Sequence, residues 1–162
     1  MNQQKQDFIE QTGLTFEQMG TTRMAGRVMG YLFICDKDLV SSDEISNALQ
    51  ASKGSISGTM KQLIQIGFAE QAGIPGDRKT YYRIANVPAG ELLKMRLKQI
   101  DTFLNTVHRG LELKEREDST TEWMIETAAF YAWTKDKIEE MIESWEEVKD
   151  EIVKKYRNTD VE

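Results

Sequence analysis

Apolar side chains recur every three or four positions through the first forty residues, the spacing of amphipathic helices. Residues 4–18 predict a first helix that can bury Phe8, Ile9 and Phe16. Residues 22–36 predict a second, whose apolar stripe is formed by Met24, Val28, Tyr31, Leu32 and Cys35. Gly26 and Gly30 lie one turn apart on it, and the close approach of another backbone would compensate for their low helix propensity.

Two short helices separated by a tight turn come next. Ser41 followed three residues later by Glu44 is a capping box, which begins a helix by satisfying its first free amides. The chain then turns at residues 50–51. Either Ser52 or Ser55 caps the following helix.

A β-hairpin follows this pair of helices. Gly67 is a typical helix stop, after which residues 68–74 and 79–85 predict two strands rich in β-favouring residues. Between them, Pro75 presets φ and Gly76 accepts a positive φ, so the connection is a turn.

Two stretches of helical periodicity fill the rest of the chain after Pro88. The apolar stripe of the first consists of Leu93, Leu97, Ile100, Leu104, Val107 and Leu111. Ser119 and Glu122 predict a second capping box, and the stripe beyond it consists of Trp123, Phe130, Ile138, Met141, Trp145, Val148, Ile152 and Tyr156. The pattern leaves open whether residues 120–157 form one helix or two. One small domain cannot bury both stripes, so a partner subunit is expected.

The predicted fold is mainly α with a small β-hairpin: a winged helix-turn-helix core with long N- and C-terminal dimerisation helices. Residues 41–86 form the core, residues 1–40 form N-terminal helices that support it and dimerise, and residues 87–162 form C-terminal dimerisation helices with a possible effector region. In a helix-turn-helix the second helix enters the major groove. The expected partners are therefore double-stranded operator DNA and a second copy of the chain.

The second helix of this core has the chemistry for such a contact. Ile56 lies at the centre of its inward face, and Met60, Leu63 and Ile64 follow on the same side. No carboxylate lies between residues 53 and 69, and a helix face that is polar without acids favours a phosphate-lined groove. The expected DNA-binding residues of this helix are Ser52, Lys53, Ser55, Ser57, Gly58, Lys61 and Gln62.

The turn of the hairpin adds Arg78 and Lys79, which can enter a minor groove. Asp77 is expected to hold the Arg78 guanidinium through a charge-assisted hydrogen bond. Two alternatives stay open. Gly54 and Gly58 could ease packing against another helix, and the winged helix could be a protein-interaction module that does not bind DNA.

Charge is distributed unevenly along the 162 residues. The net charge of -6, taken alone, argues against nucleic acid as a partner. Residues 51–85, however, carry a net charge of +3, whereas residues 112–162 carry -8. DNA is therefore expected to meet the basic segment, with modest non-specific affinity.

Composition excludes several classes of protein. Cys35 is the single cysteine and His108 the single histidine, which excludes an intrachain disulfide and the usual zinc site. No apolar run is long enough for a membrane span, and no phosphate loop or nucleophile motif occurs. We expect a cytoplasmic protein that is not an enzyme and needs no cofactor, metal or membrane. Cys35 is expected to be an inert buried thiol, with a redox sensor as the alternative.

Three blocks of sequence resemble the GbsR-type branch of the MarR-like transcriptional regulators. They are residues 23–32 (RMAGRVMGYL), 52–57 (SKGSIS) and 75–82 (PGDRKTYY), within a resemblance that covers residues 15–115. The resemblance implies a homodimeric winged-helix transcription factor, most simply a repressor, on a palindromic operator. It also implies control of the uptake or synthesis of choline and glycine betaine.

The C-terminal region is rich in aromatic residues, and a quaternary ammonium such as choline is recognised by aromatic faces. Trp123, Phe130 and Trp133 are close enough in helical phase to form one wall of a choline cage, and they are the candidate effector residues. The alternative is that the three side chains belong to the core or to a dimer interface, which their helical spacing also predicts.

Overall fold

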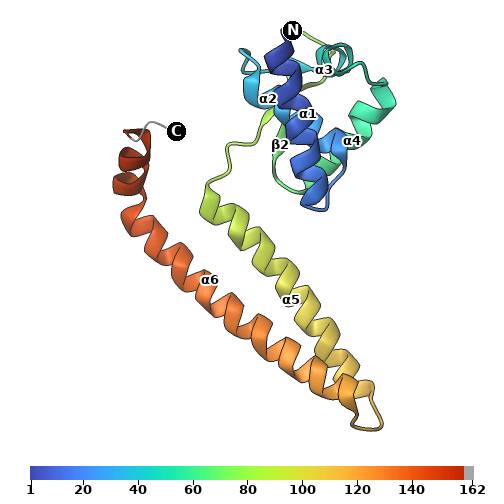
Figure 1. Cartoon of the computed structure of the whole chain (residues 1–162), viewed down its shortest axis with the longest axis vertical. Helices are drawn as coiled ribbons and strands as arrows, with labels where there is room; N and C mark the ends of the chain where they lie inside the picture. The colour runs from blue at the N-terminus through green and yellow to red at the C-terminus, as the bar shows by residue number, and fades with distance from the viewer. Residues whose placement is uncertain (159–162) are drawn as a thin grey trace. The chain divides into compact units, whose positions relative to one another are not determined.

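The computed structural model describes residues 1–158 and divides into two compact units, residues 1–87 and the remainder from Pro88 (Figure 1). The first contains α1 (Gln3–Gln18), α2 (Arg23–Ile34), β1 (Val40–Ser41), α3 (Ser42–Leu49), α4 (Lys53–Gln65), β2 (Ala69–Ala72) and β3 (Tyr81–Ile84). The second contains α5 (Ala89–Leu113) and α6 (Ser119–Arg157). The predicted mainly helical winged-helix fold is confirmed.

A single apolar core holds the first unit together. Its largest fully buried side chains come from α1, α2, β1, α3 and α4: Ile9, Val28, Val40, Ile45, Ile56, Met60 and Leu63. Each contributes about 1.5–3 kcal/mol by burial. Phe8, one of the residues available to α1 for burial, remains 39% exposed, because the adjacent Ile9 occupies the inward position.

Helices α1 and α2 cross at backbone contact. A Cβ placed on Gly26 would lie 2.5 Å from the carbonyl oxygen of Thr12 and 2.7 Å from the Cα of Gly13. A Cβ on Gly30 would lie 3.1 Å from the Cα of Ile9. The predicted close approach at Gly26 and Gly30 is therefore confirmed, and α1 is the helix that makes it.

The sheet has three antiparallel strands in the order β1-β3-β2. The strand β1 was not predicted: it is two residues long and pairs Val40 with Tyr82 and Ser41 with Tyr81. The two predicted strands are shorter than expected, because pairing between them runs only from Ala69 with Ile84 to Ala72 with Tyr81. Residues 73–80 consequently form a longer connection than the expected turn.

The predicted capping box of α3 is present. The Ser41 hydroxyl accepts from the Glu44 amide at 3.2 Å, and a Glu44 carboxylate oxygen accepts from the Ser41 amide at 2.9 Å. Between α3 and α4, Gln50 adopts a left-handed conformation with φ 51°. Ser52, rather than Ser55, caps α4, because its hydroxyl accepts from the Ser55 amide at 3.1 Å.

The second unit is a pair of long antiparallel helices (Figure 1). Residues 119–157 form one continuous helix, which answers the question that the sequence pattern left open. Its N-terminal cap lies one residue earlier than predicted: Asp118, not Ser119, is the capping residue, and its carboxylate accepts from the Thr121 amide at 3.0 Å. Asp118 also pairs with Lys114, which favours this position.

Candidate nucleic-acid interface

Helix α4 presents one polar, largely exposed face and one buried face. Ile56, Met60 and Leu63 are fully buried, and Thr59 is buried beside them. The outward side is free of acids and is formed by Lys53, Gly54, Ser55, Ser57, Gly58, Lys61 and Gln65, all of which are exposed. Six of the nine predicted DNA-binding residues, Ser52, Lys53, Ser55, Ser57, Gly58 and Lys61, therefore lie together at the surface of this helix and its cap.

Two residues of α4 are placed differently from expectation. Ile64, predicted to point inward, is 37% exposed, because it lies about 80° around the helix from Ile56. Gln62 is half-buried, and its side-chain oxygen lies 3.5 Å from the Thr22 hydroxyl at the start of α2. Gln62 thus lies on the side of the helix next to the start of α2.

The glycines of α4 face open space. Apart from its chain neighbours and the backbone of its own helix, Gly58 has no described atom within 4 Å of the position a Cβ would take, and Gly54 has the Ser52 hydroxyl at 3.9 Å. Within residues 1–158, no other helix packs against these two glycines. Because glycine has no side chain, a ligand can come into contact with the helix backbone at these two positions.

An acidic neighbour that sequence reasoning missed lies beside α4. Lys53 Nζ pairs with Asp43 Oδ1 of α3 at 2.7 Å, and both side chains are largely exposed. Lys53 lowers the pKa of Asp43 through a hydrogen bond and its charge. Because an exposed ion pair is weak, a phosphate can take the place of Asp43. Asp43 and Lys53 are ten residues apart in the sequence and belong to different helices. Only the turn between α3 and α4 brings their side chains together, so the sequence alone does not indicate the pair.

The wing is the β2–β3 connection, residues 73–80. Gly76 has φ 83°, as its place in a turn requires, and Arg78 and Lys79 are exposed. The expected role of Asp77 is wrong: its carboxylate accepts from the Lys79 amide at 2.9 Å and from the Tyr81 hydroxyl at 2.7 Å. These two hydrogen bonds lower the pKa of Asp77. Asp77 orders the loop, and Arg78 is left to reach outward.

The wing and the helix-turn-helix are tied through β1. The Ser42 amide, at the start of α3, donates to the Thr80 carbonyl at 3.1 Å. Arg83, counted among the basic residues of this region, pairs with Glu70 across β2 and β3. The charge offered by the wing therefore comes from Arg78 and Lys79.

The three candidate effector residues lie exposed along one helix. Trp123, Phe130 and Trp133 are each 58% exposed along α6. The Phe130 and Trp133 rings lie 6.2 Å apart with a tilt of 37°, whereas Trp123 lies seven residues away, about 10 Å along the helix. A cation must lie within about 6 Å of each ring centre it contacts, and of these three rings Phe130 and Trp133 are the pair in mutual contact.

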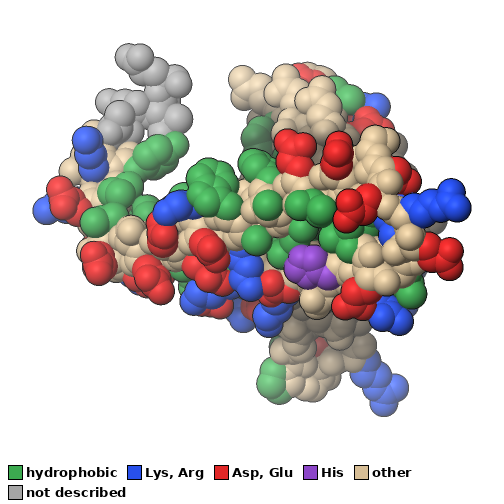
Figure 2. All heavy atoms as spheres, turned by 90° about the horizontal axis from the view of Figure 1, so that it is seen from below, with side chains coloured by type: hydrophobic (Ala, Val, Ile, Leu, Met, Phe, Trp, Pro, Cys, Tyr) green, Lys and Arg blue, Asp and Glu red, His purple; other side chains and the backbone are tan. Residues whose placement is uncertain are grey.

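The remaining candidates have ordinary surroundings. Cys35 is half-buried one helical turn from Tyr31, and burial raises the pKa of Tyr31. His108 is exposed on α5, beside surface apolar side chains (Figure 2). Residues 1–158 contain no group of three potential ligands that could hold a metal ion. In the same range no helix is long and apolar enough to cross a membrane.

The helix-turn-helix, the left-handed turn at Gln50 and the basic hairpin together define a winged helix-turn-helix protein. Comparison with known proteins gives its family. The chain belongs to the MarR-like winged-helix transcriptional regulators. A family model described as MmpR5-like MarR family transcriptional regulator matches residues 89–148.

Two relatives support this assignment. The HTH-type transcriptional regulator MmpR5 of Mycobacterium tuberculosis (strain ATCC 25618 / H37Rv) is 47% identical over 78 residues, which are 48% of this chain and 47% of that protein. The matched part thus spans about half the length of MmpR5. The crystal structure of a transcriptional regulator superposes with a TM-score of 0.80 at 30% identity, covering 89% of this chain and 99% of the other. These relatives are regulators of transcription and not enzymes.

Proposed function

We propose that the protein is a homodimeric, sequence-specific DNA-binding repressor, with α4 as the recognition helix and the wing as a second contact. The observation that carries the proposal is the outward face of α4: Lys61 lies among small polar residues, Gly54 and Gly58 leave the backbone open, and the helix has no carboxylate. Such a face suits a phosphate-lined groove. Arg78 and Lys79 supply further positive charge from the same unit.

The second unit supports the homodimer. Its core is small: Leu104, Val107 and Ala128 form one buried cluster, and Leu97 and Ile142 are buried further along the helices. Its large exposed apolar side chains are far more numerous: Met95, Phe103, Leu113, Trp123, Ile125, Phe130, Tyr131, Trp133, Met141, Val148, Ile152, Val153 and Tyr156. Exposed apolar surface of this extent is typical of a protein–protein interface.

Charge removal tests the DNA contact. The probe is a duplex containing the DNA upstream of the protein's own gene, and binding is measured by fluorescence anisotropy at several salt concentrations. Lys61→Ala should reduce the slope of log K against log salt by about one unit, because one phosphate contact is lost. Arg78→Ala should weaken binding about tenfold if its guanidinium enters a groove.

Lys98→Ala on α5 is the matched control, because it removes the same charge from an exposed position of the other unit. It should leave binding unchanged. If the wild-type protein binds the duplex and both Lys61→Ala and Arg78→Ala bind as tightly, α4 and the wing are not the DNA-binding surface. Absence of DNA binding by the wild-type protein is the result that the alternative, a protein-interaction module that does not bind DNA, requires.

The regulated genes and the effector rest on the resemblance to GbsR-type regulators alone. Under this proposal choline is the effector, and its site uses the exposed rings of Trp123, Phe130 and Trp133, with the second subunit as the source of the remaining walls. Titration with choline to millimolar concentration, followed by tryptophan fluorescence and by the DNA-binding assay, tests this. Unchanged fluorescence and unchanged DNA binding would remove choline from the proposal.

A further inference from the structure

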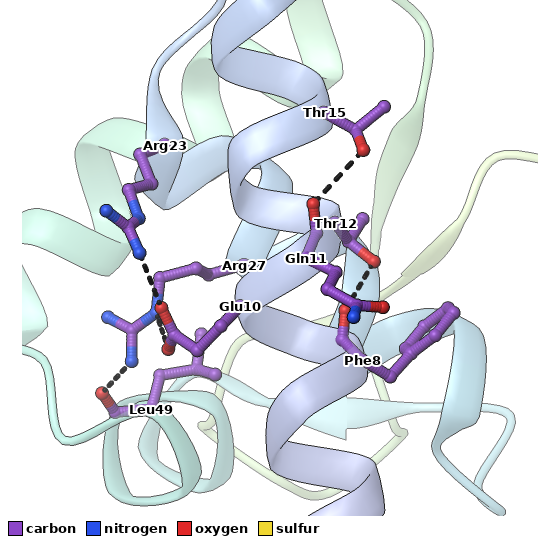
Figure 3. A network of polar contacts seen from close by, with 8 residues as sticks. All are labelled: Phe8, Glu10, Gln11, Thr12, Thr15, Arg23, Arg27 and Leu49. Carbon is purple, nitrogen blue, oxygen red and sulfur yellow. Dashed lines mark hydrogen bonds and ion pairs between the residues drawn. The ribbon is translucent and has the colours of Figure 1, made fainter.

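Arg27 of α2 connects two other helices (Figure 3). Its Nε donates to Glu10 Oε1 of α1 at 2.7 Å, and its Nη2 donates to the carbonyl oxygen of Leu49 in α3 at 3.2 Å. Arg23 binds the second oxygen of the same Glu10 carboxylate at 3.3 Å and makes no contact with α3 in Figure 3. Arg27 is also the better shielded of the two, because its side chain is 24% exposed and that of Arg23 is 48% exposed.

The Leu49 carbonyl belongs to the end of α3, where the last four carbonyls of a helix have no partner within it. Leu49 itself is 2% exposed, so water has little access to it. The neighbouring polar groups are satisfied inside the turn: the Ala51 amide donates to the Ser46 carbonyl at 3.0 Å, and the Ser46 hydroxyl donates to the Ala51 carbonyl at 2.6 Å. Arg27 adds a hydrogen bond that comes from outside the helix-turn-helix.

This turn determines the direction in which α4 leaves α3. Leu49 is the last residue of α3, Gln50 is left-handed, and Ser52 caps α4 only three residues after Leu49. A shift of the Leu49 carbonyl is therefore passed directly to the start of the recognition helix. The guanidinium is planar and rigid, so a group that binds one edge of it fixes the direction of the other.

On the other side of Arg27, α1 and α2 behave as one body. Their backbones touch at Gly26 and Gly30, and a Cβ on Gly13 would lie 2.9 Å from Cγ of Arg27 itself. The stem of Arg27 is thus packed against α1, and its head is oriented by Glu10 of α1. The side chain that binds the turn between α3 and α4 is therefore also positioned by α1.

We infer that Arg27 is a positioning residue for DNA binding: it fastens the turn between α3 and α4 to the α1–α2 pair, so that the direction of the recognition helix depends on the position of α1. The inference rests on the proposed function, because it concerns the use of α4 on DNA. It adds to that function a residue that lies outside the DNA-contacting surface.

Hydrogen–deuterium exchange of the full chain tests the fastening without DNA. The reporters are the amides of Ala51, Ser55 and Ile56, which donate to Ser46, to the Ser52 hydroxyl and to the Ser52 carbonyl. Arg27→Ala should accelerate exchange in a peptide covering residues 46–56 about tenfold, because a charged hydrogen bond is lost. Exchange in β2 and β3 should be unchanged.

Two variants separate the turn contact from the ion pair. Arg23→Ala removes a partner of the same Glu10 carboxylate and leaves Leu49 untouched, so exchange in residues 46–56 should stay within about twofold of wild type. Arg27→Lys keeps the charge beside Glu10 but replaces the fork by a single ammonium. Hydrogen exchange of Arg27→Lys should match wild type in α1 and match Arg27→Ala in residues 46–56. Arg27→Lys replaces Arg27→Ala in the experiment if the alanine variant does not fold.

DNA binding to the upstream duplex completes the experiment. Arg27→Ala and Arg27→Lys should bind about tenfold more weakly than wild type, and Arg23→Ala should bind as wild type does. Unchanged exchange in the turn, equal acceleration throughout the first unit, or a loosened turn with unchanged DNA affinity would each overturn the inference. If the wild-type protein does not bind the duplex, the proposed function is not supported with this DNA. The exchange data then decide separately whether Arg27 stabilises the turn between α3 and α4.

Discussion

Replacement of Gly26 by alanine measures how rigidly α1 and α2 are joined. The new Cβ would lie 2.5 Å from the Thr12 carbonyl oxygen and 2.7 Å from both the Gly13 Cα and the Phe16 Cβ. These atoms are backbone or directly attached to it, so no side-chain rotation relieves the overlap. The two helices must separate by up to about 1 Å to restore ordinary van der Waals distances of about 3.5 Å.

The expected cost follows from two opposing terms. Overpacking of this kind costs about 3 kcal/mol, at the upper end of the usual range, because the clashing atoms cannot rotate away. Alanine has a helix propensity better than that of glycine by about 1 kcal/mol, which offsets part of the loss. Gly26→Ala should therefore lower the free energy of unfolding of the first unit by about 2 kcal/mol.

Gly58→Ala is the matched control, because it is the same substitution at a helical position where the new Cβ meets no other part of the described structure within 4 Å. It should stabilise the first unit by about 1 kcal/mol through helix propensity alone. Tryptophan fluorescence is unsuitable, since Trp123, Trp133 and Trp145 all lie in α6. Urea unfolding followed by hydrogen exchange of α2 peptides gives the needed local free energy. Equal stability of the two variants would refute the backbone contact.

Three further outcomes are expected. Hydrogen bonds from Lys37 and then from the Ser41 amide and hydroxyl lower the pKa of Glu44 to about 2, so its contribution is full above pH 4.5 and disappears as the pH falls toward 2. Glu44→Gln should then cost about 1 kcal/mol near pH 7, after allowance for solvent screening, and the difference from wild type in urea unfolding should vanish near pH 2. Met60→Ala should cost about 3 kcal/mol in the same assay, because Met60 is fully buried. Tyr81→Phe removes the hydroxyl that binds Asp77 and should weaken binding to the upstream duplex about threefold without changing the melting temperature.

Local signals in the sequence predicted well wherever the cause of a structure lies within a few residues. The capping box of α3, the burial of Ile56, Met60 and Leu63 in α4, and the positive φ of Gly76 each depend on neighbours along the chain, and each is present. The predicted start of α6 is wrong by one residue, and this error also has a local cause. Asp118 and Ser119 can both cap a helix, and the salt bridge to Lys114 favours Asp118.

Features that depend on tertiary contacts were not predictable in this way. The strand β1 is defined by pairing with Tyr81 and Tyr82, forty residues away, and has no periodicity of its own. The side-chain partner of Asp77 is the Tyr81 hydroxyl rather than the Arg78 guanidinium, because the hairpin brings the phenol back to the loop. Gln62 has the same local character as its neighbours on α4, and only the tertiary fold places it beside Thr22.

The unbroken length of α6 restricts how its sequence can change. Thirty-nine residues rise about 58 Å with no internal break at which a change of length could be absorbed. One residue inserted at the middle would rotate everything after it by about 100°, which would turn Ile142 away from Gly90 of α5. Insertions or deletions of seven residues change the phase by only about 20°. We therefore expect single-residue insertions to be tolerated best in residues 114–118, the connection between α5 and α6.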